Sequence, residues 1–218
     1  MTAPVPHAVP RSVPLGAALI AAGVVQFTVA MAVVQAKYPG YSDFSNYISD
    51  LGNTATSPWH EVFNVSIILL GLLAFVGVLL SWEAFPSGAS RPVGLALVLI
   101  ASLAAIMVGL FPENVNPSVH DTVSLLVFAP GGVALVVLGG GMHARSGWQW
   151  LRGPSVVLGL VTLVSLGYYV PTQASNTTWG PGLIERLIVA PILIWGFLAA
   201  LQLLRRAREP SLDRRLTG

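Results

Sequence analysis

Six long apolar runs dominate this sequence and leave few folds open to it. They fall at about 13–36, 59–81, 92–111, 119–141, 153–170 and 182–204, with turn-forming residues between them. Each run has about 18 residues or more, which is long enough for a helix to cross a hydrocarbon core of about 30 Å. None alternates apolar and polar residues as a barrel strand does. The sequence therefore predicts an all-α, polytopic membrane bundle of six transmembrane helices, as a single domain over 1–218.

Composition supports a membrane protein and removes several kinds of chemistry. Hydrophobic residues make up 54% of the chain and charged residues 9%, whereas soluble domains carry charge on about a quarter of their residues. The chain has no cysteine. Disulfides, thiolate catalysis, iron–sulfur clusters and cysteine-bound zinc are therefore excluded, and any metal must be held by His, Asp or Glu.

The charges are distributed unevenly between the two sets of loops. Nine of the 11 basic residues fall on the side of the termini: Arg11, Arg91, Arg145, Arg152, Arg205, Arg206, Arg208, Arg214 and Arg215. Because Lys and Arg are retained in cytoplasmic loops, we expect both termini to be cytoplasmic and the protein to lie in the plasma membrane. Residues 205–218 form a basic cytoplasmic tail. Attraction to anionic lipid explains its charge, so no nucleic-acid partner is expected.

Most carboxylates lie in the opposite, outer loops: Asp43, Asp50, Glu61, Glu113, Asp121 and Glu185. In the first outer loop, Phe44, Ile48 and Leu51 are spaced to share one helical face. The polar side chains that share the other face are Asp43, Asn46, Tyr47 and Asp50. This pattern predicts a short amphipathic helix lying across the mouth of the bundle. In the simpler interpretation, Asp43 and Asp50 only solvate an interfacial lid.

The even-numbered spans begin alike, with a proline followed by an acid within about one turn. Capping explains the acids, because a carboxylate near a helix N-terminus is favoured by the helix dipole. Capping does not explain His60 and His120, which also lie in such first turns. Together with a carboxylate they could form a two-histidine site for a divalent metal such as zinc. No close-spaced metal motif accompanies them.

Three short segments resemble a known family. Tyr47-Ile48-Ser49-Asp50-Leu51-Gly52, Phe111-Pro112-Glu113 and His120 together look like the bacterial and archaeal membrane family catalogued as domain of unknown function 998. The resemblance covers nearly the whole chain and implies six helices, but no established reaction. The positions that it carries over are Ser49, Asp50, Gly52, Glu113 and His120. More distantly, the chain is similar to the FRAG/DRAM/Sfk type of six-helix protein, which is associated with lipid remodelling.

Three functions follow from this pattern. The first is handling of a lipid or prenyl-type substrate in an acid/His pocket near the extracytoplasmic face, because ionisable groups next to lipid are functional candidates. The second is a membrane-embedded enzyme, either a metal-assisted lipid hydrolase or an acid-dependent isoprenoid cyclase. The third is a scaffold or assembly subunit without a pocket.

The candidate residues are the same for the first two functions. The candidate catalytic residues are Asp50, Glu61, Glu113 and His120. The candidate substrate-binding residues are Asp43, Asn46, Tyr47, Ser49, Trp59, Glu185 and Arg186. Zinc is the cofactor hypothesis, with His60 and His120 as its ligands. The expected partners are the lipid bilayer and a lipid or prenyl ligand, and the oligomeric state is left open.

Overall fold

The computed structural model describes residues 10–142 and 147–216, and this part of the chain contains only helices and turns. The six α-helices are α1 (Ser12–Lys37), α2 (His60–Ser81), α3 (Ser90–Leu110), α4 (Pro117–Gly141), α5 (Gln149–Ala174) and α6 (Pro181–Leu216). Two short 3₁₀ helices, η1 (Ser49–Gly52) and η2 (Trp82–Ala84), flank α2. Arg145, which entered the charge count, lies outside the described residues.

All six α-helices are long and apolar enough to cross a membrane, which confirms the predicted bundle. The first four begin and end within two residues of the predicted ranges. The fifth is four residues longer at each end, and the sixth continues through the basic segment to Leu216. The residues from Arg205 to Arg208 are mostly good helix formers, so the helix has no reason to stop where the apolar run stops.

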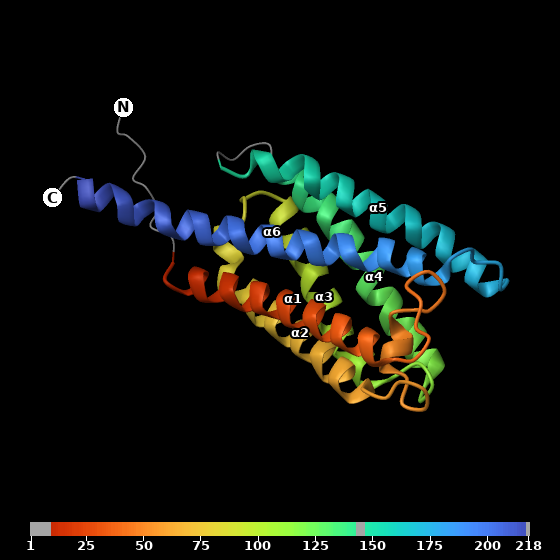
Figure 1. The fold of residues 1–218 in the computed structure, drawn as a ribbon. Helices are drawn as coiled ribbons and strands as arrows, with labels where there is room; N and C mark the ends of the chain where they lie inside the picture. Colours follow the sequence, from red (N-terminus) through yellow and green to blue (C-terminus); the bar gives the residue numbers. More distant parts are fainter. Residues whose placement is uncertain (1–9, 143–146, 217–218) are drawn as a thin grey trace.

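The helices are arranged in a ring in chain order. Each packs against the next, and α6 closes the ring against α1. Short connections make sequential helices antiparallel neighbours, so the start of α1 and the end of α6 lie at the same end of the bundle (Figure 1). We call the other end, formed by residues 38–59, 111–116 and 175–180, the acidic end.

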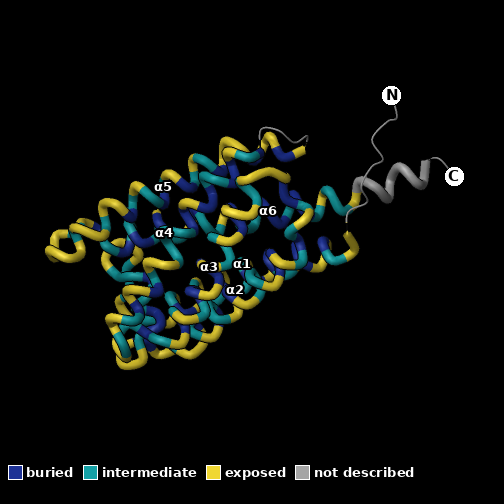
Figure 2. Tube along the Cα trace, turned by 180° about the vertical axis from the view of Figure 1, so that it is seen from behind, coloured by how far each residue is buried: buried dark blue, intermediate teal, exposed yellow. Residues whose placement is uncertain are grey.

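Small residues allow the helices to approach closely. A Cβ atom built on Gly77 in α2 would lie 2.6 Å from the carbonyl oxygen of Gly16 in α1. Lipid tails are as apolar as leucine side chains, so helix association in a membrane depends on this kind of close packing. Buried residues face the inside of the ring and exposed ones its outside (Figure 2). Large exposed side chains such as Leu15, Val29 and Val164 suit contact with lipid.

The first outer loop differs from the prediction. Only η1 is helical, and residues before it form turns instead of one amphipathic helix. The carbonyl oxygen of Phe44 accepts hydrogen bonds from the backbone N–H groups of Gly182 and Leu183 at the start of α6. Arg186 binds the carbonyl oxygens of Asp43 and Asn46. These acceptors are therefore committed to α6 rather than to bonds along a helix of their own.

Candidate functional site

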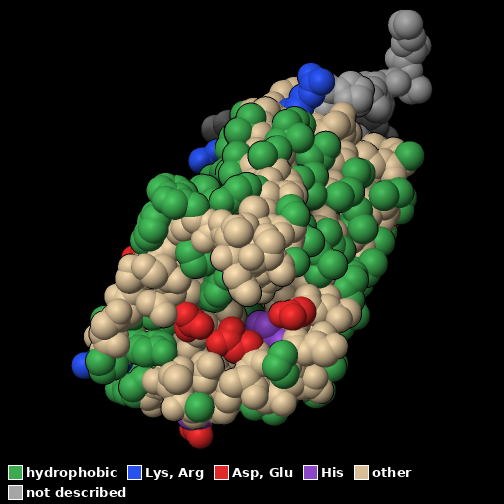
Figure 3. Space-filling view, turned by 90° about the vertical axis from the view of Figure 1, so that its right-hand side faces the viewer, with side chains coloured by type: hydrophobic (Ala, Val, Ile, Leu, Met, Phe, Trp, Pro, Cys, Tyr) green, Lys and Arg blue, Asp and Glu red, His purple; other side chains and the backbone are tan. Residues whose placement is uncertain are grey.

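A polar cavity of about 210 Å³ lies at the acidic end. Its lining comes from the first outer loop, the start of α4, the end of α5 and the start of α6, with Glu113 between α3 and α4. The polar side chains around it are Tyr47, Ser49, Glu113, His120, Asp121, Ser124, Tyr169, Gln173 and Glu185. A space-filling view of this end shows acidic side chains gathered around histidine at a hollow in the surface (Figure 3).

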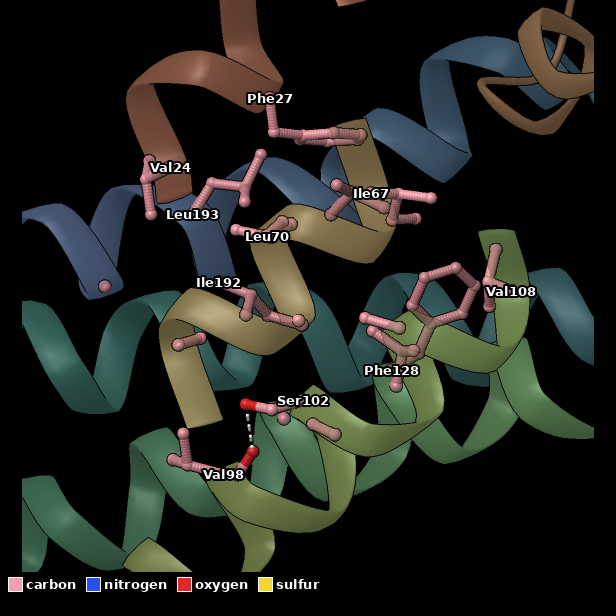
Figure 4. A pocket seen from close by; sticks show the side chains of 18 of the residues that line it. Val24, Phe27, Ile67, Leu70, Val98, Ser102, Val108, Phe128, Ile192 and Leu193 are labelled. Carbon is pink, nitrogen blue, oxygen red and sulfur yellow. Dashed lines mark hydrogen bonds between the residues drawn. The ribbon is translucent and has the colours of Figure 1, made fainter. Parts of the chain in front are cut away.

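A second, apolar cavity of about 150 Å³ lies inside the ring of helices. Side chains from α1, α2, α3, α4 and α6 line it, among them Phe27, Leu70, Val98 and Ile192 (Figure 4). Even the hydroxyl of Ser102 in this lining is satisfied by the carbonyl oxygen of Val98, at 2.8 Å. The cavity therefore offers an almost wholly apolar surface.

The apolar cavity is long. On α6 its lining runs from Glu185 to Ala199, and at 1.5 Å per residue these two positions are about 21 Å apart. This length is about two thirds of a hydrocarbon core of roughly 30 Å. This length suits an extended chain.

The two cavities are adjacent. Five residues line both of them: Ser49, His120, Ser124, Phe128 and Glu185. The acidic end of the apolar cavity is thus the floor of the polar one. Together the two volumes come to the lower end of the range for small-molecule pockets, about 300–1,000 Å³.

Glu185 lies at this junction. It is in the first turns of α6 and only 7% exposed. Its Oε2 atom accepts a hydrogen bond from the backbone N–H of Ile48, which ties the first outer loop to α6. A buried carboxyl group needs partners for its oxygen atoms. Among the described residues, Oε1 of Glu185 has no hydrogen-bond donor.

His120 is the second ionisable group at the junction and is also 7% exposed. Its Nδ1 atom lies 2.9 Å from the carbonyl oxygen of Phe111. A carbonyl oxygen only accepts, so Nδ1 carries a proton and donates it. In the neutral ring Nε2 is then an acceptor, and it has no partner among the described residues. The link to Phe111 also fixes the orientation of the ring.

Glu113 borders the polar cavity from the loop between α3 and α4. Burial raises the pKa of its carboxyl group, hydrogen bonds from Ser49 and Asn53 partly offset this, and the neighbouring Asp50 carboxylate raises the pKa further. The Asn53 Nδ2 atom donates to Oε1 at 3.1 Å. Glu113 therefore keeps its proton to higher pH than an exposed glutamate.

We expect the stability of the protein to fall as pH rises because of Glu113. A carboxyl group with a raised pKa in the folded state binds more protons folded than unfolded, so the free energy of unfolding decreases with pH. The decrease begins near the usual glutamate pKa of about 4.3 and ends above the raised pKa. Glu113→Gln should flatten this part of the plot of melting temperature in detergent against pH.

Glu61→Gln, which changes an exposed carboxyl group, is the matched control and should keep the slope of melting temperature against pH. An unchanged slope in Glu113→Gln would contradict the role assigned to Glu113.

Two tyrosines that contact each other line the polar cavity. The rings of Tyr47 and Tyr169 meet edge to face, with centroids 6.0 Å apart and an interplanar angle of 84°. Burial raises the pKa of the Tyr47 hydroxyl, an effect that its hydrogen bond with Tyr169 reduces. The Tyr47 phenol is thus protonated at neutral pH and able to donate a hydrogen bond.

Several other predicted residues hold the loop instead of lining a cavity. The Arg186 guanidinium binds the carbonyl oxygens of Asp43, Asn46 and Gly182, the Tyr41 hydroxyl and the Asp43 carboxylate. We call this set of contacts the Arg186 clasp. Asp50 accepts hydrogen bonds from the Asn46 side chain and the Tyr47 backbone, each at 3.0 Å. Neither cavity is lined by any of these four predicted residues: Asp43, Asn46, Asp50 and Arg186.

The remaining predicted residues lie outside both cavities. Trp59 is 43% exposed and packs against the Lys37 ammonium, 5.9 Å from the ring centroid. Glu61 is exposed, and the Nδ1 atom of His60 lies 2.9 Å from the carbonyl oxygen of Ser57. The described residues contain no group of three or more His, Asp or Glu side chains that could hold a metal ion. The zinc site stays a prediction without geometric support here.

Sequence reasoning missed part of the lining. Asp121 had been assigned to capping, and Ser124, Phe128, Tyr169 and Gln173 had not been singled out. Tyr169 and Gln173 are polar side chains close to one end of an apolar run, which is a usable signal, because such groups next to lipid tend to face a cavity or a partner helix.

Comparison with known proteins gives one match. The model of a family described as a protein of unknown function (DUF998) matches residues 20–202. No curated protein and no solved structure matches the chain. The more distant resemblance to the FRAG/DRAM/Sfk type stays a prediction.

Proposed function

We propose that this chain, which belongs to the DUF998 family of proteins of unknown function, binds a single amphipathic lipid or prenyl-type molecule. The apolar chain of the ligand would occupy the cavity inside the ring of helices, and its polar end would occupy the acid/His cavity near the predicted extracytoplasmic face. The observation that carries the proposal is the junction of the two cavities at Glu185 and His120.

Physical chemistry supports an occupied apolar cavity. An apolar cavity of about 150 Å³ stays dry and takes up small apolar molecules, and an empty one forfeits the contacts of its walls. Around this protein the bilayer supplies amphipathic molecules in large excess. A ligand chain inside the ring would make the contacts that the helices do not make with one another.

The placement of the polar groups at one end of the pocket also supports the proposal. Most ligand pockets combine apolar walls with a few placed polar groups that set orientation. Here the polar groups gather at one end only, so a ligand can enter in one orientation. In a scaffold without a ligand, Oε1 of Glu185 and, in the neutral ring, Nε2 of His120 would have no donor among the described residues.

The test is to measure lipid retained by the purified protein with native mass spectrometry. In Ser124→Phe, the new ring projects into the junction of the cavities, and we expect retained ligand to fall at least about tenfold through steric exclusion from the pocket. Leu126→Phe is the matched control, since Leu126 is on the same helix, is 43% exposed and lines neither cavity. Equal retention in wild type and Ser124→Phe, or no stoichiometric ligand in the wild type, would contradict the proposal.

A further inference from the structure

If the proposed function holds, the charges around the polar cavity indicate which charge the polar end of the ligand carries. Three carboxyl groups line it, those of Glu113, Asp121 and Glu185. Within the described part of the chain, its lining includes neither lysine nor arginine. A phosphate or carboxylate on the ligand would meet like charges without a counter-charge, at a site partly shielded from water.

Arg186 does not line the polar cavity, although its charge acts on the neighbouring Glu185. It directly follows Glu185, but its guanidinium forms its ion pair with Asp43, at 2.7 Å. The same guanidinium binds three backbone carbonyl oxygens and lies 5.6 Å from the centroid of the Tyr41 ring. These contacts direct it into the loop. The other basic residue at this end, Lys37, lies against Trp59.

Two acceptor atoms at the junction have no hydrogen-bond donor among the described residues. They are Oε1 of Glu185 and, in the neutral ring, Nε2 of His120, both on side chains that line both cavities. The bonds to Ile48 and Phe111 occupy the other atoms of these two groups. Neither atom is among the buried side-chain atoms that lack a partner, so both are open to a donor that a ligand brings.

The aromatic rings add a third feature. Tyr47 and Tyr169 both line the polar cavity, and the face of a tyrosine ring attracts a cation within about 6 Å. Carboxylates, unpaired acceptors and aromatic rings are together the surroundings that an ammonium group prefers.

We propose that the ligand is an amphiphile with a positively charged amine at its polar end, and that Glu185 and Asp121 are the carboxylates that select it. Glu185 accepts a hydrogen bond from the ammonium at the floor of the polar cavity. Asp121, which is exposed at the rim, supplies charge where the ligand enters.

The experiment compares three probes that share one chain: dodecylamine, dodecanol and dodecyl phosphate. Each is titrated by native mass spectrometry against the full-length protein in nanodiscs of zwitterionic lipid, which have no net surface charge. Because charge-assisted hydrogen bonds are about twice as strong as neutral ones, we expect the amine to bind about tenfold more tightly than the alcohol. The phosphate should bind more weakly than either.

Variants show whether the preference arises at this site. Glu185→Gln and Asp121→Asn should each reduce the preference for the amine over the alcohol, and Asp121→Asn keeps the test open if the buried substitution prevents folding. Glu83→Gln, at the opposite end of the bundle, should leave it unchanged. Equal binding of amine and alcohol, preference for the phosphate, or an amine preference that survives in both variants would overturn this inference. Binding of none of the three probes would instead refute the proposed function on which it rests.

Discussion

Arg186→Ala is expected to lower the free energy of unfolding by about 3 kcal/mol, since hydrogen bonds from a charged group contribute about 1.5–3 kcal/mol each. The Arg186 clasp has five hydrogen bonds: four join the first outer loop to the start of α6, and the fifth, to the Gly182 carbonyl oxygen, stays within α6. Without the guanidinium, three backbone carbonyl oxygens lose their donor. Equilibrium unfolding in a denaturing detergent measures the change.

Asp43→Ala removes the ion pair with Arg186 and keeps the hydrogen bonds of Arg186 to the backbone carbonyl oxygens. The Asp43 side chain is 72% exposed, and exposed ion pairs contribute at most about 1 kcal/mol. We therefore expect this variant to lose much less stability than Arg186→Ala. If the two variants lost the same stability, the ion pair alone would account for the effect, and the role assigned to the carbonyl contacts would be wrong.

Gly77→Ala is expected to lower the free energy of unfolding by about 2 kcal/mol, because it overpacks the contact between α1 and α2. The added methyl group would lie 2.6 Å from both the Gly16 carbonyl oxygen and Cγ1 of Ile20. The side chain of Ile20 can move, but the carbonyl oxygen moves only if the helices separate. The same unfolding titration measures the loss.

Gly167→Ala is the matched control for this substitution. Gly167 is in the membrane-spanning helix α5, and a Cβ atom there meets no atom within 4 Å. Its expected effect is within about 0.5 kcal/mol. A loss as large as that of Gly77→Ala would show that removal of any helical glycine is costly, and that close approach of α1 to α2 is not the cause.

The membrane-spanning helices were predictable because length and hydropathy alone define them. Their arrangement was not. Each helix is apolar on nearly all sides, so the pattern does not indicate which face turns inward. Ala101 and Leu103 illustrate this: both are apolar and two positions apart in α3, yet Ala101 lines the central cavity and Leu103 is 49% exposed on the outside.

In the first outer loop, the spacing of apolar residues predicted which residues are buried better than it predicted the backbone conformation. Phe44, Ile48 and Leu51 have helical spacing, and Ile48 and Leu51 are indeed buried. Phe44 instead packs edge to face on Trp179, with ring centroids 4.9 Å apart. Tertiary contacts to α6, which lies more than a hundred residues later in the sequence, decide the backbone conformation. Periodicity carries no information about such contacts.

The site was predictable in part. Outer position and ionisable chemistry indicated Tyr47, Glu113, His120 and Glu185, and the family resemblance indicated Ser49. The structure brings these five residues together around the polar cavity. The same reasoning could not separate them from Asp43 and Asp50, which are equally acidic. Asp43 binds Arg186, and Asp50 binds Asn46 and Tyr47, instead of lining the cavity. The contribution of α5 was missed because its polar side chains form no motif, and only their position near the end of an apolar run marks them.

The central claim is that a ligand chain lies inside the ring of helices, and photo-crosslinking tests it most directly. A dodecylamine analogue with a diazirine at the tip of its chain would be bound, irradiated and mapped by peptide mass spectrometry. The account predicts labelling of Ser102 and Ala105, which line the apolar cavity on α3, and loss of this labelling in Ser124→Phe. Labelling confined to Ile100 and Leu103, which face outward on the same helix, would contradict it.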